Sequence, residues 1–200
     1  TCSKLLTSHP KINKIAFTGG VHTAKHIVRN SAENLSQISL ELGGKSPVVV
    51  FKDARKNNAI NGIMASIFGA GGQSCIAGSR LYLQEEIYDE YLEELKNRVE
   101  EIEIGDPLST TTQLGPLATL NQLQNIEEKI KQTKELGGKI ITGGNKVDKF
   151  KNGYYFEPTI IECANHNLPV AENELFGPVL SVMKFKDEEN AIKLMNDNSF

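Results

Sequence analysis

The feature that most constrains the fold is a strand–turn–helix–strand pattern in the first quarter of the chain. Residues 14–18 form a short apolar run that ends at Gly19-Gly20, and a helical pattern over residues 23–34 follows. Residues 37–42 then alternate between polar and apolar side chains, which is the period of a strand. Two strands joined through a helix make a βαβ unit, in which the strands are parallel. The start of the chain therefore predicts part of a parallel sheet.

The rest of the chain continues this alternation of strands and helices. Gly43-Gly44 interrupts the pattern and predicts a boundary between a domain over residues 1–43 and a second over residues 44–200. Pro158 lies inside one expected strand and indicates an edge strand or a bulge, because proline has no N–H to donate. The fold class is α/β, with helices that cover a mostly parallel sheet. In the second domain we expect strands at 47–51, 79–84, 139–142, 154–162 and 179–185, and helices at 54–67, 86–103, 119–136 and 187–196.

The composition is that of a globular soluble protein, with 39% hydrophobic and 24% charged residues. A net charge of −3 gives no electrostatic reason to expect nucleic acid or an anionic membrane as a partner. The longest apolar run, residues 47–51, is too short to span a bilayer. The three cysteines are widely spaced and include no CxxC pair, so they do not form a disulfide framework. Free thiols suit a reducing compartment, and we therefore expect a cytoplasmic location. Both ends look like cuts through a longer chain.

The histidines give no metal-binding spacing. His22 and His26 are four residues apart on an expected helix and could share a face, but no third ligand accompanies them. We predict no metal site.

The strongest chemical signal is a cysteine in a glycine-rich loop, Gly69-Ala70-Gly71-Gly72-Gln73-Ser74-Cys75. A thiol on a loop between two patterned segments can reach a substrate, and small neighbours let backbone N–H groups approach the reacting atom. Cys75 is therefore the candidate nucleophile. An ordinary turn that holds a partly buried free cysteine is the alternative at this point.

Glu41 is the candidate general base beside this thiol. It alternates with leucines in an expected strand and precedes two glycines, and burial of such a carboxyl would raise its pKa toward the range in which a base works well. The alternative is a strand residue that forms a salt bridge, with Lys45 as its partner.

Two further segments are compatible with cofactor binding. Gly19-Gly20 lies at a strand-to-helix turn that could present N–H groups to a phosphate, although the full GxGxxG pattern is absent. Glu174 could accept hydrogen bonds from ribose hydroxyls, with Phe176 as a neighbouring wall. Spacing alone leaves packing and turn roles open for both segments.

Taken together and in order, four motifs resemble the NAD(P)-dependent aldehyde dehydrogenase superfamily. They are Phe17-Thr18-Gly19-Gly20, Leu40-Glu41-Leu42-Gly43-Gly44-Lys45-Ser46-Pro47, Gly72-Gln73-Ser74-Cys75 and Glu174-Leu175-Phe176-Gly177-Pro178-Val179. The resemblance covers essentially the whole chain. It implies the end of a Rossmann-like cofactor domain over residues 1–43 and most of a catalytic domain over residues 44–200.

The resemblance implies the roles of individual residues. The Cys75 thiolate would attack an aldehyde, hydride would pass to the nicotinamide, and Glu41 would activate the water that releases the acid. Gly19, Gly20 and Leu42 would contact the cofactor, Glu174 would bind the nicotinamide ribose, and Phe176 would pack near the nicotinamide. The cofactor would be NAD or NADP, with NAD favoured, and the substrate a small organic aldehyde.

Family members are much longer, so the resemblance also implies missing parts. These include most of the cofactor sheet, a second oxyanion donor and the segment that builds oligomer contacts. We therefore expect a homo-oligomer at full length, and we expect this piece alone to be inactive.

Two other functions remain open. A relative could pass the thioester to coenzyme A or phosphate, although the presence of Glu41 disfavours this reaction. A catalytically silent relative could serve as a structural or binding protein, although Cys75 and Glu41 are both present.

Overall fold

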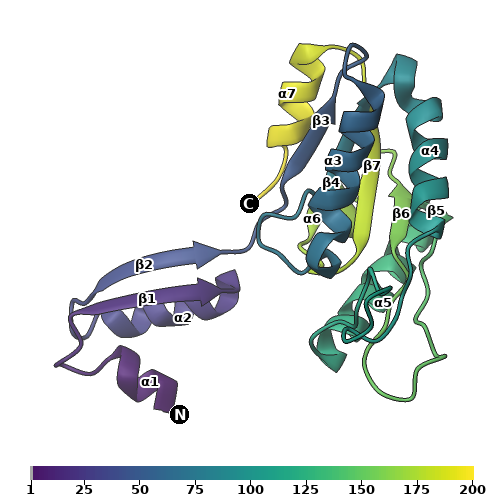
Figure 1. The fold of residues 1–200 in the computed structure, drawn as a ribbon. Helices are drawn as coiled ribbons and strands as arrows, with labels where there is room; N and C mark the ends of the chain where they lie inside the picture. Colours follow the sequence, from purple (N-terminus) through teal and green to yellow (C-terminus); the bar gives the residue numbers. More distant parts are fainter. Residues whose placement is uncertain (1) are drawn as a thin grey trace. The chain divides into compact units, whose positions relative to one another are not determined.

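The computed structural model describes residues 2–200, which form two compact units (Figure 1). One unit ends at Gly44, and the other runs from Lys45 to Phe200. Among the described residues, no helix combines the length and the apolar character needed to cross a lipid bilayer.

The first unit is the expected βαβ arrangement with one additional short helix. Its strands are parallel and in register from the pair Lys14 and Gln37 to the pair Gly19 and Leu42. The helix between them buries Ala24 and Ile27. In chain order the elements are α1 (Cys2–Thr7), β1 (Lys14–Gly19), α2 (Val21–Ser31) and β2 (Gln37–Leu42).

The second unit is built on one five-stranded sheet in the order β3-β4-β7-β6-β5. The first four strands in that order are parallel, and β5 is antiparallel to β6. This confirms the mostly parallel sheet predicted from the sequence. The strands are β3 (Pro47–Val50), β4 (Arg80–Gln84), β5 (Lys139–Thr142), β6 (Thr159–Glu162) and β7 (Val179–Phe185).

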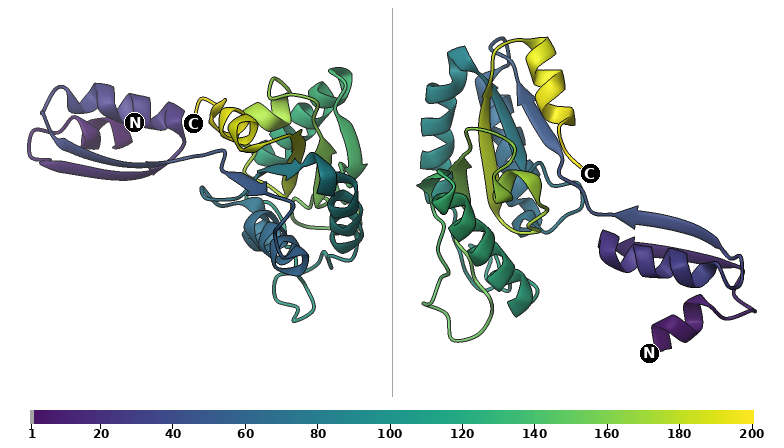
Figure 2. Two further views of the ribbon diagram at one scale, coloured as in Figure 1. Left: turned by 90° about the horizontal axis from the view of Figure 1, so that it is seen from above. Right: turned by 180° about the vertical axis from the view of Figure 1, so that it is seen from behind.

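Helices cover both faces of this sheet, which Figure 2 shows with α3 and α7 on opposite sides. Successive side chains of a strand point to opposite faces, so Leu81 and Leu83 pack into the core under α3 and α4, while Tyr82 packs into the core under α5 and α6. The helices are α3 (Lys56–Phe68), α4 (Tyr88–Glu100), α5 (Leu120–Glu135), α6 (Pro169–Glu172) and α7 (Glu188–Asn196), with short 3₁₀ turns η1 (Gly69–Gly72) and η2 (Glu85–Ile87).

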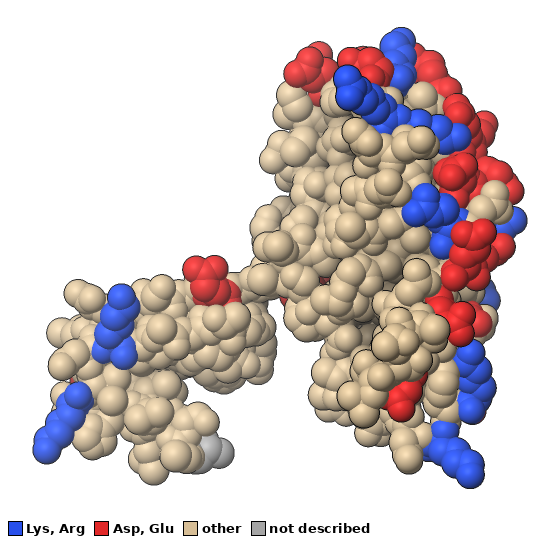
Figure 3. Space-filling view, viewed as in Figure 1, with Lys and Arg blue, Asp and Glu red and all other residues tan. Residues whose placement is uncertain are grey.

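Charged side chains gather over α4 on the outside of the second unit (Figure 3). Lys56 of α3 pairs there with Glu90 and Glu94 of α4. These side chains are partly exposed to solvent, so the pairs contribute little to stability.

One predicted strand differs from the structure. The strand expected over residues 154–162 begins only at Thr159, directly after Pro158, and it lies inside the sheet between β5 and β7. The edge-strand alternative was wrong, because Pro158 precedes the ladder and no N–H is missing from it. The bulge alternative has a counterpart in the pairing of β5 with β6, whose register shifts between Ile140 and Thr142. The chain before it makes only isolated bridges, such as that between Lys146 and Phe156.

Candidate active site

The Cys75 loop begins with three consecutive residues in the left-handed region. Ala70, Gly71 and Gly72 have φ values of 50°, 62° and 67°. This region suits glycine and strains a residue with a Cβ atom, so Ala70 holds a costly conformation. The result is an abrupt change of direction where α3 ends.

Cys75 lies at the tip of a tight turn that follows. The N–H of Ala77 donates to the carbonyl of Ser74 at 3.1 Å, so Cys75 and Ile76 occupy the two central positions of the turn. Both side chains are exposed. The turn is anchored to α3 because the N–H of Gly78 donates to the carbonyl of Ser66 at 3.1 Å. The thiol is therefore exposed to solvent on a turn whose backbone is fixed by these hydrogen bonds.

Gly72 packs the Cys75 loop against a distant segment of the chain. A Cβ atom at this position would lie 2.1 Å from the carbonyl oxygen of Gly177 and 3.0 Å from that of Ile67. Only glycine permits such a close approach of two backbones. This contact brings the loop next to the segment that contains Glu174 and Phe176.

Gln73 ties the loop to a second neighbouring segment. Its side-chain oxygen accepts from the N–H of Ala118 at 2.9 Å, and its side-chain nitrogen donates to the carbonyl of Pro116 at 3.3 Å. The sequence showed Gln73 only as part of a motif, and its bridging position depends on a segment more than forty residues away.

Phe176 also has left-handed backbone geometry, with a φ of 54°. Its carbonyl accepts a hydrogen bond from the side chain of Gln122, and its ring is exposed. The neighbouring Leu175 is buried in the core, which fixes the segment, while Glu174 is half-buried. An exposed aromatic ring and a carboxylate thus lie on the segment that Gly72 contacts.

The other site residues predicted from the sequence lie together in the first unit. The register pairs Thr18 with Glu41 and Gly19 with Leu42, at the carboxyl ends of both strands. Gly20 is the N-cap of α2, and it has no side chain that could accept hydrogen bonds from the first N–H groups of the helix. Glu41 is exposed in this unit, so the expected burial of its carboxyl group is not found among the described residues.

Lys45, at the start of the second unit, is a buried lysine. Lys45 is 3% exposed, and its ammonium group has no hydrogen-bond partner among the described residues. Burial, reinforced by the charge of Arg80, lowers the pKa of Lys45 to about 7, and the charges of Cys163 and Glu174 act in the opposite direction.

Residues 2–200 contain no group of three or more histidine, cysteine, aspartate or glutamate side chains arranged to hold a metal. His22 and His26 do share a face of α2, with ring centroids 4.8 Å apart. None of the residues that the structure describes adds a third ligand to this pair.

Comparison with known proteins shows the family of the chain. The model of the aldehyde dehydrogenase family matches residues 1–200. The chain belongs to the aldehyde dehydrogenase family. It is 50% identical over 200 residues to a (Z)-2-((N-methylformamido)methylene)-5-hydroxybutyrolactone dehydrogenase of Acinetobacter baylyi, a match that covers 100% of this chain and 41% of that protein. It is 37% identical over 199 residues to a betaine aldehyde dehydrogenase of Vibrio vulnificus, covering 98% and 41% of the two proteins.

Solved structures share the fold. A crystal structure of PnpE in complex with nicotinamide adenine dinucleotide matches with a TM-score of 0.96 and 39% identity, over 99% of this chain and 41% of that one. A betaine aldehyde dehydrogenase of Staphylococcus aureus in complex with NAD⁺ matches with a TM-score of 0.95 and 35% identity, over 98% and 39%. This aldehyde dehydrogenase chain therefore spans about two fifths of the length of the relatives it matches.

Proposed function

We propose that the protein containing this chain oxidises an aldehyde to a carboxylic acid with NAD, through a covalent intermediate on Cys75. The observation that carries the proposal is the exposed thiol on a backbone turn whose position is set by the contact of Gly72 with Gly177. Family membership supports the same chemistry.

Cys75 acts as the nucleophile. Once its proton has left, the sulfur attacks the carbonyl carbon of the aldehyde, a C–S bond forms, and the carbonyl oxygen becomes an oxyanion. The Cys75 N–H is suited to donate to this oxyanion, because no described residue accepts a hydrogen bond from it. The product of this step is a thiohemiacetal.

The chain carries residues that fit a nicotinamide cofactor. The uncapped N-terminus of α2 offers N–H groups to a pyrophosphate, and no acidic side chain in its first turn repels that group. Glu174 would accept from ribose hydroxyls, Phe176 would pack against the nicotinamide, and Leu42 would lie beside it. A bound NAD⁺ would supply the hydride acceptor that oxidation of the Cys75 thiohemiacetal to a thioester requires.

Glu41 completes the turnover. Its carboxylate would take a proton from a water molecule that attacks the thioester carbon, the C–S bond breaks, and the Cys75 thiolate departs as the acid forms. A base is required because water is a weak nucleophile at neutral pH. The exposed position of Glu41 at the end of β2 leaves its carboxylate accessible.

The test is NADH formation by the intact protein with NAD⁺ and a panel of aldehydes that includes betaine aldehyde. We expect reduction with at least one aldehyde and loss of reduction in Cys75→Ala. The isolated 200-residue chain should show neither tight NAD binding nor turnover. A Glu41→Gln variant should form one equivalent of NADH rapidly and then stall as the thioester. Acyl-CoA as the main product, or an unchanged steady state in Glu41→Gln, would contradict the role of Glu41.

A further inference from the structure

The sequence contains two Asn-Gly pairs, and the fold places them in different backbones. Asn61-Gly62 lies inside helix α3, whereas Asn152-Gly153 lies on the loop between β5 and β6. The backbone nitrogen that follows an asparagine can attack the side-chain amide, and glycine hinders this attack least because it has no Cβ atom. The local backbone therefore decides which of the two pairs can react.

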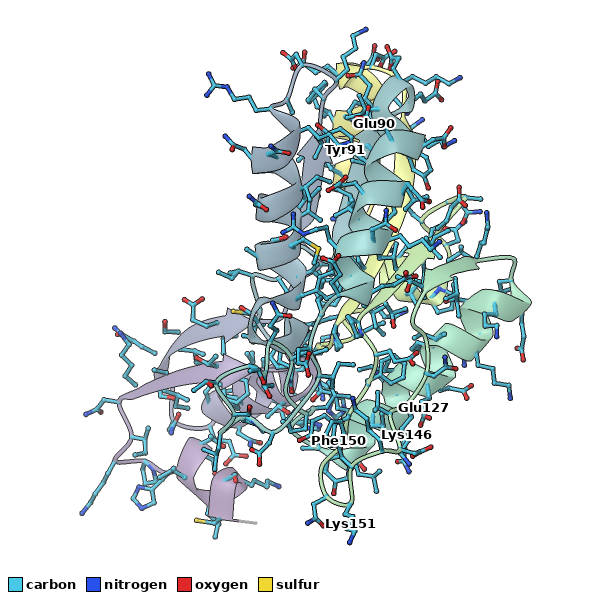
Figure 4. All side chains as sticks on the ribbon, turned by 45° about the vertical axis from the view of Figure 1, so that its right-hand side comes forward. Glu90, Tyr91, Glu127, Lys146, Phe150 and Lys151 are labelled. Carbon is cyan, nitrogen blue, oxygen red and sulfur yellow. The ribbon has the colours of Figure 1, made fainter. Side chains whose placement is uncertain are left out.

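Asn152-Gly153 lies at the outer end of its loop. Residues 151–154 are exposed, and Figure 4 shows Lys151 at the end of the loop with its side chain directed away from the sheet. Aromatic rings hold the loop on both sides of the pair, since the ring centroids of Phe150 and Tyr155 are 4.1 Å apart. Water can therefore reach the pair while the chain on either side is anchored.

The attacking group and the attacked group at Asn152 are both available. No described residue accepts a hydrogen bond from the N–H of Gly153, and none binds the side chain of Asn152. Gly153 has a φ of 97°, which lies outside regular helix and strand geometry, so no ladder holds its nitrogen. This nitrogen can approach the side chain of Asn152 without first breaking a hydrogen bond.

Asn61-Gly62 is also exposed, but hydrogen bonds hold both of its reacting groups. The side-chain oxygen of Asn61 accepts from Arg98 of α4 at 3.2 Å. Helix α3 runs from Lys56 to Phe68, so the N–H of Gly62 donates to a carbonyl four residues earlier. Attack would break both hydrogen bonds and unwind the middle of a helix. Exposure therefore does not distinguish the two pairs, whereas backbone hydrogen bonding does.

We propose that Asn152 is a site of spontaneous deamidation and that Asn61 is not. The nitrogen of Gly153 attacks Cγ of Asn152, a C–N bond forms, and the side-chain amide nitrogen leaves as ammonia, which carries away the proton of the Gly153 nitrogen. The resulting succinimide takes up water at either carbonyl carbon and opens to aspartate or isoaspartate. Nothing is oxidised or reduced, and water is the only co-reactant. The site does not depend on the proposed dehydrogenase reaction.

The modification adds a negative charge, and isoaspartate also lengthens the main chain by one carbon atom. Both changes fall beside a segment that supports the loop of the candidate nucleophile. A Cβ atom on Gly153 would lie 3.4 Å from Cβ of Pro116, and the carbonyl of Tyr154 accepts from the N–H of Leu117 at 2.8 Å. Gln73 binds the same segment through the carbonyl of Pro116.

The test incubates the intact protein at mildly alkaline pH, cleaves it after glutamate residues and follows the peptide masses. Cleavage after Glu135 and Glu157 releases fragment 136–157, which contains Asn145 and Asn152. We expect a mass gain of about 1 Da that fragmentation assigns to Asn152. The gain should be faster at higher pH, because the nitrogen of Gly153 attacks after losing its proton. Asn152→Gln should abolish it, since a glutamine side chain cannot form the same ring.

Two other asparagines are internal controls. Asn145 lies in the same loop, but a lysine follows it and its side chain donates to Glu157 at 2.9 Å, so it should gain no mass. Asn61 should stay unmodified in the folded protein and should react at a rate comparable to that of Asn152 in denaturing urea, where α3 is absent. No gain at Asn152, equal gains at both Asn-Gly pairs in the folded protein, or protection of Asn61 that persists in urea would overturn the proposal.

Discussion

Cys75 and Cys163 are free thiols in the same unit, and their surroundings are opposite. Cys75 lies exposed at the tip of a tight turn, whereas Cys163 is 4% exposed and follows β6 directly. Burial raises the pKa of Cys163 to about 12, so its thiolate is almost absent at neutral pH. The comparison teaches that the backbone and its packing, more than the residue type, decide which thiol can act as a nucleophile.

The largest expected effect comes from removing each thiol in turn. Cys75→Ala should reduce NADH formation by the intact protein on the order of 10⁴-fold or more, because the variant lacks the sulfur on which the proposed thioester forms. Cys163→Ala should leave the rate within about twofold and lower stability by roughly 1 kcal/mol through a small cavity. Steady-state rates and denaturant midpoints of both variants check this. Equal losses of activity would remove the distinction between the two thiols.

A smaller change is expected when the support of the Cys75 turn is altered. Gly72→Ala places a methyl group 2.1 Å from the Gly177 oxygen at a φ of 67°, so the loop must shift. A displacement of about 1 Å costs roughly 10²-fold in rate. Gly69→Ala is the matched control, since nothing lies within 4 Å of its Cβ position and its φ is −58°. The measurement is kcat together with the rate of Cys75 alkylation, and similar values for the two variants would contradict the role of Gly72.

Removing the side-chain bridge of Gln73 should have an intermediate effect. Gln73→Ala loses both hydrogen bonds to residues 116–118, which together contribute roughly 1–3 kcal/mol to the position of the turn. We expect kcat to fall by about tenfold, while Cys163 stays unreactive toward iodoacetamide. Unchanged kcat would show that the contact of Gly72 with Gly177 alone holds the turn.

The smallest effect concerns the buried charge near Cys163. Lys45 binds a proton below about 7 in the folded protein and below 10.5 in the unfolded chain. Between these pH values the unfolded chain binds more protons, so this group makes the free energy of unfolding rise with pH. Relative to Lys45→Met, the wild type should gain roughly 1–2 kcal/mol between pH 7 and 9.

Urea unfolding of the wild type and Lys45→Met at both pH values measures this difference. The variant also tests the thiol comparison, because the ammonium of Lys45 opposes the rise in the pKa of Cys163. Parallel pH dependence of the two proteins would show that Lys45 stays charged in the folded state.

Much of the fold was predictable because its signals are local. The apolar run before Gly19-Gly20 and the alternation around Glu41 identified β1 and β2, and the strand at 179–185 has the predicted bounds. The strand after Pro158 was misjudged because its place between β5 and β7 depends on pairing with residues far along the chain. The local residue pattern predicts that a segment forms a strand, but it does not predict which strands lie beside it in the sheet.

For the candidate site, too, local features were predictable and contacts between distant segments were not. The sequence by itself identified the thiol of Cys75, the carboxylates of Glu41 and Glu174 and the family motifs around them, since chemical identity and local order are written in the chain. Only the tertiary structure decided that Gly72 meets Gly177, that Gln73 bridges to Pro116 and Ala118, and that Lys45 and His166 are buried without a full set of partners. Burial and pKa are sums over neighbours from distant segments, and those neighbours exist only once the chain has folded.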